Sequence, residues 1–139
     1  MSGIEVVHVT DQNKSILSQF IDNMGSSSDS FRYFKTRTID AIKNHEKTLV
    51  LVREDDIVAY GHLDREDKLW LGICVVDTET GKGYGQMMMD YLLDDQKEPI
   101  YLTVDKANIR AVHLYEKYGF KPVRNEQTFI VMEKNDTSI

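Results

Sequence analysis

The chain has 139 residues, of which 29% are charged and 41% hydrophobic, and its formal net charge is −6 at pH 7. This size predicts one domain over residues 1–139, and the acidic balance argues against nucleic-acid binding and favours neutral or cationic partners. The single cysteine, Cys74, excludes an internal disulfide framework, and we find neither a membrane-spanning apolar run nor a signal-peptide core, so we expect a cytoplasmic protein.

The first third of the chain predicts a strand followed by helical segments. Residues 4–9 form an apolar-rich strand, and Thr10 or Asp11 is expected to cap a helix through residues 16–21. Residues 25–30 are mostly serine with one glycine, which is typical of a loop. A second helix is expected around residues 39–42.

The middle of the chain predicts three neighbouring strands joined by short polar turns. They occupy residues 48–52, 57–64 and 69–76. Such turns cannot support parallel crossovers, so the strands should form an antiparallel meander. In the second of them we expect Val58, Tyr60 and His62 on one face, with His62 on a polar side.

The second half predicts two helices around a parallel strand. The first helix, residues 87–93, carries its apolar side chains at three- and four-residue spacing, and residues 100–104 then form a strand parallel to residues 69–76. The second helix should pack Ala111, Leu114, Tyr115 and Tyr118 on one side and end at Gly119. Two further strands are expected at residues 120–123 and 127–132. No internal repeat appears.

A glycine-rich turn between the strand at 69–76 and the following helix predicts an anion site. Gly81, Gly83 and Gly85 allow sharp turns and close approach of a ligand, and a helix N-terminus offers unpaired N–H groups to phosphate. A dinucleotide fingerprint would need glycine where Gln86 stands, and a Walker A loop would need Ser or Thr after its lysine. The pattern that remains is x-x-x-Gly-x-Gly at residues 80–85.

A second motif follows at residues 108–120, Asn-Ile-Arg-Ala-Val-His-Leu-Tyr-Glu-Lys-Tyr-Gly-Phe. It resembles the N-x-x-A-x-x-L-Y-x-x-x-G-F pattern of the GNAT superfamily of N-acetyltransferases, with every fixed position present. The glycine turn resembles that family's pyrophosphate-binding arm, and the two motifs come in the family's order. The resemblance covers residues 47–134 well. It implies a mixed α/β fold, in which a mostly antiparallel sheet contains a splayed parallel pair of strands and is flanked by about four helices.

The resemblance also implies acetyl-CoA as co-substrate and a set of residues that bind it. The backbone of the glycine turn would hold the pyrophosphate, residues of the preceding strand would pair with the pantetheine arm, and an asparagine would contact that arm. The implied residues are Ile73, Cys74, Val75, Thr80, Gly81, Lys82, Gly83, Tyr84, Gly85, Gln86 and Asn108. Many family members have Arg or Gln where Thr80 stands, so backbone groups should contribute more of the affinity for the cofactor here.

Two residues are candidates for the chemistry. By resemblance, Tyr115 would protonate the departing thiolate, since the unperturbed pKa of a phenol is close to that of an alkyl thiol; the alternative is that it only packs on its helix face. The strand segment 69–72 lacks the carboxylate that some relatives use to deprotonate the amine. His62 is the best side-chain substitute, and a water relay to His62, Asp64 or a backbone carbonyl is an equal alternative.

The acceptor is expected to be a primary amine of a small molecule. In the family the first two helices and their loop shape its pocket, which points to Phe31, Arg32 and Tyr33, where aromatic and basic side chains could bind a nucleotide-linked amino sugar. Acetylation of protein amino termini or lysines, and a non-catalytic acyl-CoA sensor, are the alternatives. We expect direct attack in a ternary complex, no metal, nucleic-acid or membrane partner, and a monomer or homodimer.

Overall fold

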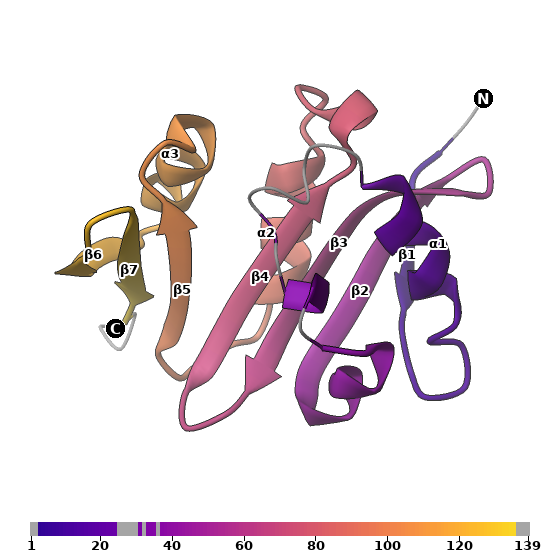
Figure 1. The fold of residues 1–139 in the computed structure, drawn as a ribbon, viewed down its shortest axis with the longest axis horizontal. Coiled ribbons are helices and arrows are strands. Elements are labelled where there is room, and N and C mark those ends of the chain that lie inside the picture. The colour runs from indigo at the N-terminus through magenta and orange to yellow at the C-terminus, as the bar shows by residue number, and fades with distance from the viewer. Residues whose placement is uncertain (1–2, 25–30, 32, 36, 136–139) are drawn as a thin grey trace.

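A mixed sheet of seven strands forms the centre of the computed structural model, which describes residues 3–24, 31, 33–35 and 37–135. The strand order is β1-β2-β3-β4-β5-β7-β6 (Figure 1). The strands are β1 (Glu5–His8), β2 (His45–Arg53), β3 (Asp56–Arg65), β4 (Leu69–Val75), β5 (Ile100–Asp105), β6 (Lys121–Asn125) and β7 (Phe129–Lys134). The α-helices are α1 (Ile16–Asn23), α2 (Tyr84–Leu93) and α3 (Ile109–Lys117), and 3₁₀ turns are η2 (Tyr33–Lys35), η3 (Ile39–Asn44) and η4 (Asp77–Glu79).

The predicted antiparallel meander is confirmed for β2, β3 and β4. Between β2 and β3 the chain reverses through Glu54 and Asp55, whose φ angles are +51° and +71°. Two left-handed residues match the twist of the strands that they join, as in a tight hairpin. The meander therefore forms a rigid half-sheet, on which β4 is the last antiparallel strand.

The parallel pair β4 and β5 splays, as the resemblance implied. The two strands pair only at Leu69 with Ile100 and at Trp70 with Tyr101. Beyond these pairs β5 stays bound to β7 along its whole length, and Figure 1 shows it diverging from β4. A wedge thus opens between the carboxyl-terminal halves of β4 and β5.

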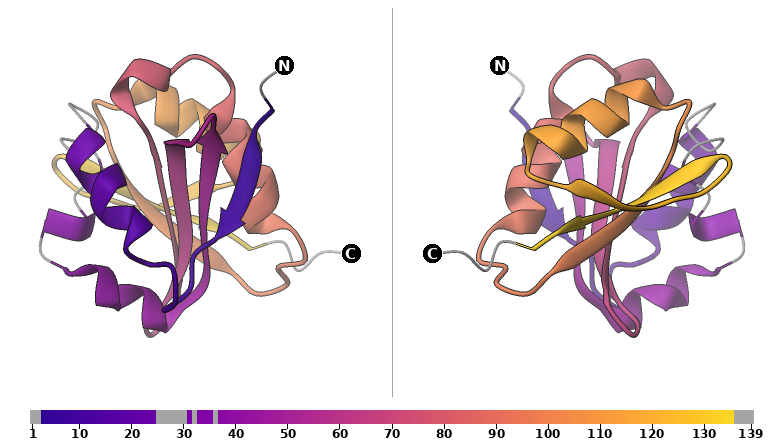
Figure 2. Two further views of the ribbon diagram at one scale, coloured as in Figure 1. Left: turned by 90° about the vertical axis from the view of Figure 1, so that its right-hand side faces the viewer. Right: turned by 90° about the vertical axis from the view of Figure 1, so that its left-hand side faces the viewer.

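Both faces of the central strands are covered. Figure 2 shows α1 and α2 on opposite faces of the sheet. One core cluster joins α2 and α3 to the sheet and contains Met88, Leu92 and Tyr115, while the other contains Phe20 and Tyr60. Val58 belongs to the first cluster and Tyr60 to the second, because a register shift between Leu51 and Val52 of β2 lies opposite this part of β3; the expectation is therefore wrong for Val58. Tyr60 and His62 do share a face, with the Tyr60 hydroxyl 2.6 Å from His62 Nδ1.

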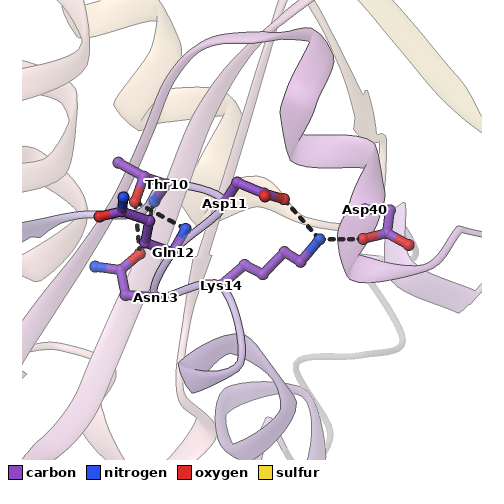
Figure 3. A network of polar contacts seen from close by, with 6 residues as sticks. All are labelled: Thr10, Asp11, Gln12, Asn13, Lys14 and Asp40. Carbon is purple, nitrogen blue, oxygen red and sulfur yellow. Dashed lines mark hydrogen bonds and ion pairs between the residues drawn. The ribbon is translucent and has the colours of Figure 1, made fainter.

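The N-terminal third departs from the sequence predictions at two points. Thr10 donates its N–H to Asn13 Oδ1 (2.6 Å) and therefore closes a turn ahead of α1, whose N-cap is Ser15 (Figure 3). Lys14 fastens the same turn by pairing with Asp11 and with Asp40 of η3. The segment expected to be a helix around 39–42 is the 3₁₀ turn η3. The predicted loop at 25–30 lies outside the described residues.

Candidate active site

A cavity of about 1100 Å³ opens in the wedge between β4 and β5. It brings together most of the residues that the sequence singled out. On its wall are Phe31, Tyr33, His62, Ile73, Cys74, Val75, Thr80, Gly81, Gly83, Tyr84, Gly85, Gln86, Asn108 and Tyr115. Lys82 does not line the cavity, although its ammonium pairs with Glu79, which does (3.0 Å). Arg32 lies outside the described residues.

At one end of the cavity the glycine turn leads into α2. Gly81 and Gly83 have φ angles of +82° and +86°, which side chains other than glycine rarely adopt. The helix begins at Tyr84, earlier than the predicted 87, and its first hydrogen bond runs from Met87 N–H to Gly83 O. The amides of residues 84–86 therefore lack a partner within the helix, and such N-terminal amides suit an anion.

Gly85 has a different task from the other two glycines. It lies in the first turn of α2, and a Cβ atom there would approach Leu114 Cδ2 of α3 to 3.2 Å. The missing side chain allows the two helices to pack closely at the cavity wall. The glycine turn and α3 are thereby held against each other.

The open edge of β4 forms one long wall of the cavity. Ile73, Cys74 and Val75 are paired with β3 on their other side, while pairing to β5 has already ended at Trp70. Thr103 of β5 forms the facing wall. Beyond Trp70 the wedge therefore separates β4 from β5 and leaves room for an extended ligand between the two strands.

The start of α3 contributes two residues to the wall. Asn108 caps the helix by accepting the N–H of Ala111 at its Oδ1 (3.3 Å), so it serves as N-cap and cavity residue together. Arg110, which sequence reasoning missed, lines the cavity beside the glycine turn, and its Nη1 lies 3.9 Å from the position of a Cβ on Gly81. The sequence signal that could have identified Arg110 was its position in the first turn of α3, two residues after the N-cap Asn108.

Tyr115 lies deeper in the wedge, on the buried side of α3. Only 7% of the residue is exposed, its ring packs edge-on against Phe120 at 6.0 Å, and it lines the cavity. Burial raises the pKa of Tyr115, and the thiol of Cys74 adds to this effect. The phenol thus keeps its proton at neutral pH and can give it to a strong base that appears in the cavity.

His62 does not lie on a polar face, and that expectation is wrong. The residue is 2% exposed, with the rings of Phe31, Tyr33 and His45 at centroid distances of 6.1, 4.4 and 4.5 Å. Burial lowers the pKa of His62 well below its usual value, with the neighbouring His45 and Arg37 acting in the same direction. The imidazole is therefore neutral at pH 7.

A buried hydrogen-bonded series lies beside His62. The hydroxyl of Tyr33 donates to Asp64 Oδ2 (2.8 Å) and lies 2.8 Å from His45 Nε2. The other ring nitrogen of His45, Nδ1, lies 2.7 Å from Thr48 Oγ1. Sequence reasoning had named Asp64 only as one end of a water relay, and these contacts give it a fixed position on the cavity wall.

The charges at this end of the cavity are mainly carboxylates. Asp64 and Glu66 line it, together with Arg37. The guanidinium of Arg37 lies over the ring of Tyr33 at 4.3 Å and 3.8 Å from Glu66 Oε2. Among the described residues at this end of the cavity, two carboxylates face one arginine, so the wall favours a cationic ligand.

The residues that the structure describes contain neither a metal-binding cluster nor a membrane-spanning helix. No group of three or more His, Cys, Asp or Glu side chains in that part of the chain has an arrangement that could hold a metal ion. Among the same residues, no helix combines the length and the apolarity needed to cross a bilayer.

Comparison with known proteins identifies relatives over most of the chain. Residues 14–120 match the model of the acetyltransferase (GNAT) family. The chain is 26% identical over 138 residues to a spermine/spermidine N(1)-acetyltransferase of Bacillus subtilis. The alignment covers 86% of this chain and 88% of that protein.

Two solved structures illustrate the likeness of fold. The GNAT domain of S. lividans PAT has a TM-score of 0.78 at 15% identity, covering 94% of this chain and 89% of that one. The yncA protein from Salmonella typhimurium, solved with its cofactor acetyl-CoA, has a TM-score of 0.73 at 13% identity, covering 99% and 96%.

Proposed function

The chain belongs to the acetyltransferase (GNAT) family, and on that premise we propose that it moves the acetyl group of acetyl-CoA to a primary amine of a small polycationic molecule. Acetyl-CoA-dependent N-acetyl transfer is the activity of the family, and the choice of acceptor is our own step. The observation that carries it is the pair of carboxylates, Asp64 and Glu66, on the wall of the cavity that also contains Tyr115.

The glycine-turn end of the cavity suits the cofactor. Amides of residues 84–86 would bind the pyrophosphate, and the open edge at residues 73–75 would pair with the amides of the pantetheine arm. Thr80 is exposed on the cavity wall and has a short side chain, while Arg110 of α3 brings a guanidinium to the wall beside Gly81. We assign Arg110 to the phosphates of acetyl-CoA.

Replacing Arg110 with glutamine should weaken acetyl-CoA binding roughly tenfold, because a charge-assisted hydrogen bond contributes about 1.5 kcal/mol. The wild-type affinity should also fall more steeply with salt than that of the variant. Titration calorimetry at two salt concentrations measures both effects. Arg124→Gln is the control, since Arg124 is exposed on β6 and pairs with Glu126 away from the cavity. Equal affinities for wild type and Arg110→Gln would contradict the assignment.

Tyr115 is placed to complete the transfer. When the amine attacks the thioester carbon and the C–S bond breaks, the departing thiolate takes the phenolic proton, and one of the nitrogen protons replaces it. The phenol lies in a buried part of the wall, where bulk water competes little for the thiolate. The burial that raises the pKa of Tyr115 would act in the same direction on the thiol of the departing CoA beside it.

The acceptor end favours a polyamine over a phosphorylated sugar. The carboxylates Asp64 and Glu66 on this wall would repel a phosphate, and Arg37 beside them contacts the ring of Tyr33 and Glu66. Carboxylates recognise ammonium groups directly. The Bacillus subtilis relative, named as a spermine/spermidine acetyltransferase, supports the same class of acceptor.

Spermidine, spermine and 1,3-diaminopropane should release CoA from acetyl-CoA with kcat/KM at least tenfold above that of a nucleotide-linked amino sugar or a lysine-containing peptide. A thiol-trapping assay with these five acceptors tests this, and mass spectrometry of the products confirms that nitrogen is acetylated. A preference for the amino sugar or the peptide would overturn the polyamine assignment. Acetyl-CoA binding without turnover of any amine would favour a sensor.

A further inference from the structure

We infer that Asp64 receives the ammonium group of the acceptor and takes its proton, and that Tyr33 and His45 hold the carboxylate in position for this step. The inference rests on the proposed function, since it requires a cationic amine as acceptor. It assigns the proton-accepting role to a residue of β3 and removes it from the neighbouring His62.

Asp64 is a buried carboxylate that reaches the cavity. It is 4% exposed, lies on the cavity wall, and pairs in the sheet with Trp70 of β4. The segment 69–72 contains no carboxylate of its own. The register of β3 against β4 therefore supplies an acidic group to the stretch of wall just before the open edge at Ile73.

The hydrogen bonds around Asp64 have a fixed direction. An ionised carboxylate only accepts, so the hydroxyl proton of Tyr33 is directed to Asp64 Oδ2. The hydroxyl oxygen must then accept from His45 Nε2, which lies 2.8 Å away. Burial lowers the pKa of His45 to about 4, so the ring is neutral and its Nδ1 accepts from the hydroxyl of Thr48.

The directed series, in which hydrogen bonds run from Thr48 through His45 and Tyr33 to Asp64, leaves Oδ1 of the Asp64 carboxylate for a ligand. Every donor in it is used once, and Oδ2 receives the last proton. The nearest nitrogen to Oδ1 within the series is His45 Nε2, at 3.9 Å and outside hydrogen-bond distance. Among the described residues none donates to Oδ1. An ammonium group in the cavity would supply the missing donor.

His62 is less suited to the same role. Its Nδ1 lies 2.6 Å from the hydroxyl of Tyr60, and its Nε2 faces Gly72 so closely that a Cβ there would be 2.5 Å away. The ring is enclosed by aromatic side chains and by His45, and Arg37 is the nearest cation that influences it. A protonated His62 would be buried without a counter-charge in contact with it.

Proton transfer from the acceptor ammonium to Asp64 precedes acetyl transfer. The ammonium N–H bond breaks, its proton forms an O–H bond with Asp64 Oδ1, and the nitrogen keeps the electron pair. That pair forms the C–N bond to the thioester carbon, after which the C–S bond breaks and Tyr115 protonates the sulfur. The acylated nitrogen loses its second proton to the Tyr115 phenolate, which restores the phenol. Asp64 then returns one proton to water, which is the net proton that acetylation of an ammonium releases.

Asp64→Asn should lower kcat/KM for 1,3-diaminopropane about 100-fold, the usual size of a general-base contribution. For 2,2-difluoro-1,3-diaminopropane the loss should stay below about tenfold, because fluorine lowers the pKa of the amines and much of this compound is already neutral. Each loss is taken relative to wild type with the same amine. Acetyl-CoA affinity should not change, as measured by calorimetry. Asp22→Asn, exposed on α1 outside the cavity, is the matched control.

Tyr33→Phe keeps the carboxylate and removes the proton donated to it, so it decides the matter if Asp64→Asn fails to fold. It should give a smaller loss, about tenfold, and again chiefly on the non-fluorinated amine. Equal losses on both amines would overturn the inference while leaving the proposed function intact. A wild type that binds acetyl-CoA but acetylates neither diamine would remove the proposed function, and this inference with it.

Discussion

Replacing Tyr115 with phenylalanine should lower kcat by about 100-fold and leave acetyl-CoA affinity nearly unchanged. The phenol is the one proton donor that we place beside the departing sulfur, so without it the thiolate must leave unprotonated or wait for water. The side chain is 7% exposed and packs on Phe120, and phenylalanine keeps that packing. None of the described residues hydrogen-bonds to the hydroxyl, so its removal leaves no partner unpaired and should shift Tm little.

The matched control is Tyr118→Phe on the same helix. The hydroxyl of Tyr118 donates its proton to Asp90 (2.8 Å), with the carbonyl of Gln86 as a second acceptor within reach (3.1 Å), and the residue does not line the cavity. Its loss should cost stability and spare kcat, the opposite of Tyr115→Phe. Steady-state rates with saturating spermidine and calorimetric acetyl-CoA binding measure the contrast. If Tyr115→Phe kept wild-type kcat, the tyrosine would serve only for packing.

The elements that the sequence predicted best are those fixed by local patterns. The meander follows from short turns such as Glu54–Asp55, and the end of α3 follows from Gly119, whose φ is +94°. The wedge required more than local pattern, because the pairing of β4 with β5 stops after Trp70 while β5 stays paired with β7, and no local sequence feature marks that point. It was expected only through the resemblance of residues 108–120 to a known family.

The polar end of the cavity could not be foreseen from periodicity. Tyr60, His62 and Asp64 alternate along β3 as the outer face of an antiparallel strand would. In the structure the segment around Tyr33 covers that face, and Tyr33 is 31 positions from its partner Asp64. A contact between elements so far apart in sequence leaves no local signal, so His62 was expected in a polar setting.

Mild acid should destabilise the fold through the same buried histidines. Burial lowers the pKa of His45 from 6.5 to about 4, so the unfolded chain binds a proton there at a higher pH than the folded chain does. Stability from this group is therefore complete above about pH 6.5 and is lost as pH falls toward 4, by up to roughly 3 kcal/mol. Asp64, which faces His45, opposes the shift, and Arg37 adds to it. His62 contributes with the same sign.

The pH range distinguishes the loss of stability caused by His45 from that caused by the surface carboxylates. Asp40, Glu79 and Glu98 have lowered pKa values in their ion pairs, so they are protonated only in stronger acid. Urea unfolding between about pH 7 and pH 5 should therefore give a steep loss of stability in wild type and a shallower one in His45→Gln, which cannot titrate. The variant should be the less stable protein at neutral pH, since Tyr33 and Thr48 lose a partner, with the gap closing in acid. His8→Gln, exposed on β1, should follow the wild-type curve.

Parallel curves for wild type and His45→Gln would show that the folded protein protonates His45 as readily as the unfolded chain does. The directed series from Thr48 to Asp64 would then have no neutral imidazole at its centre.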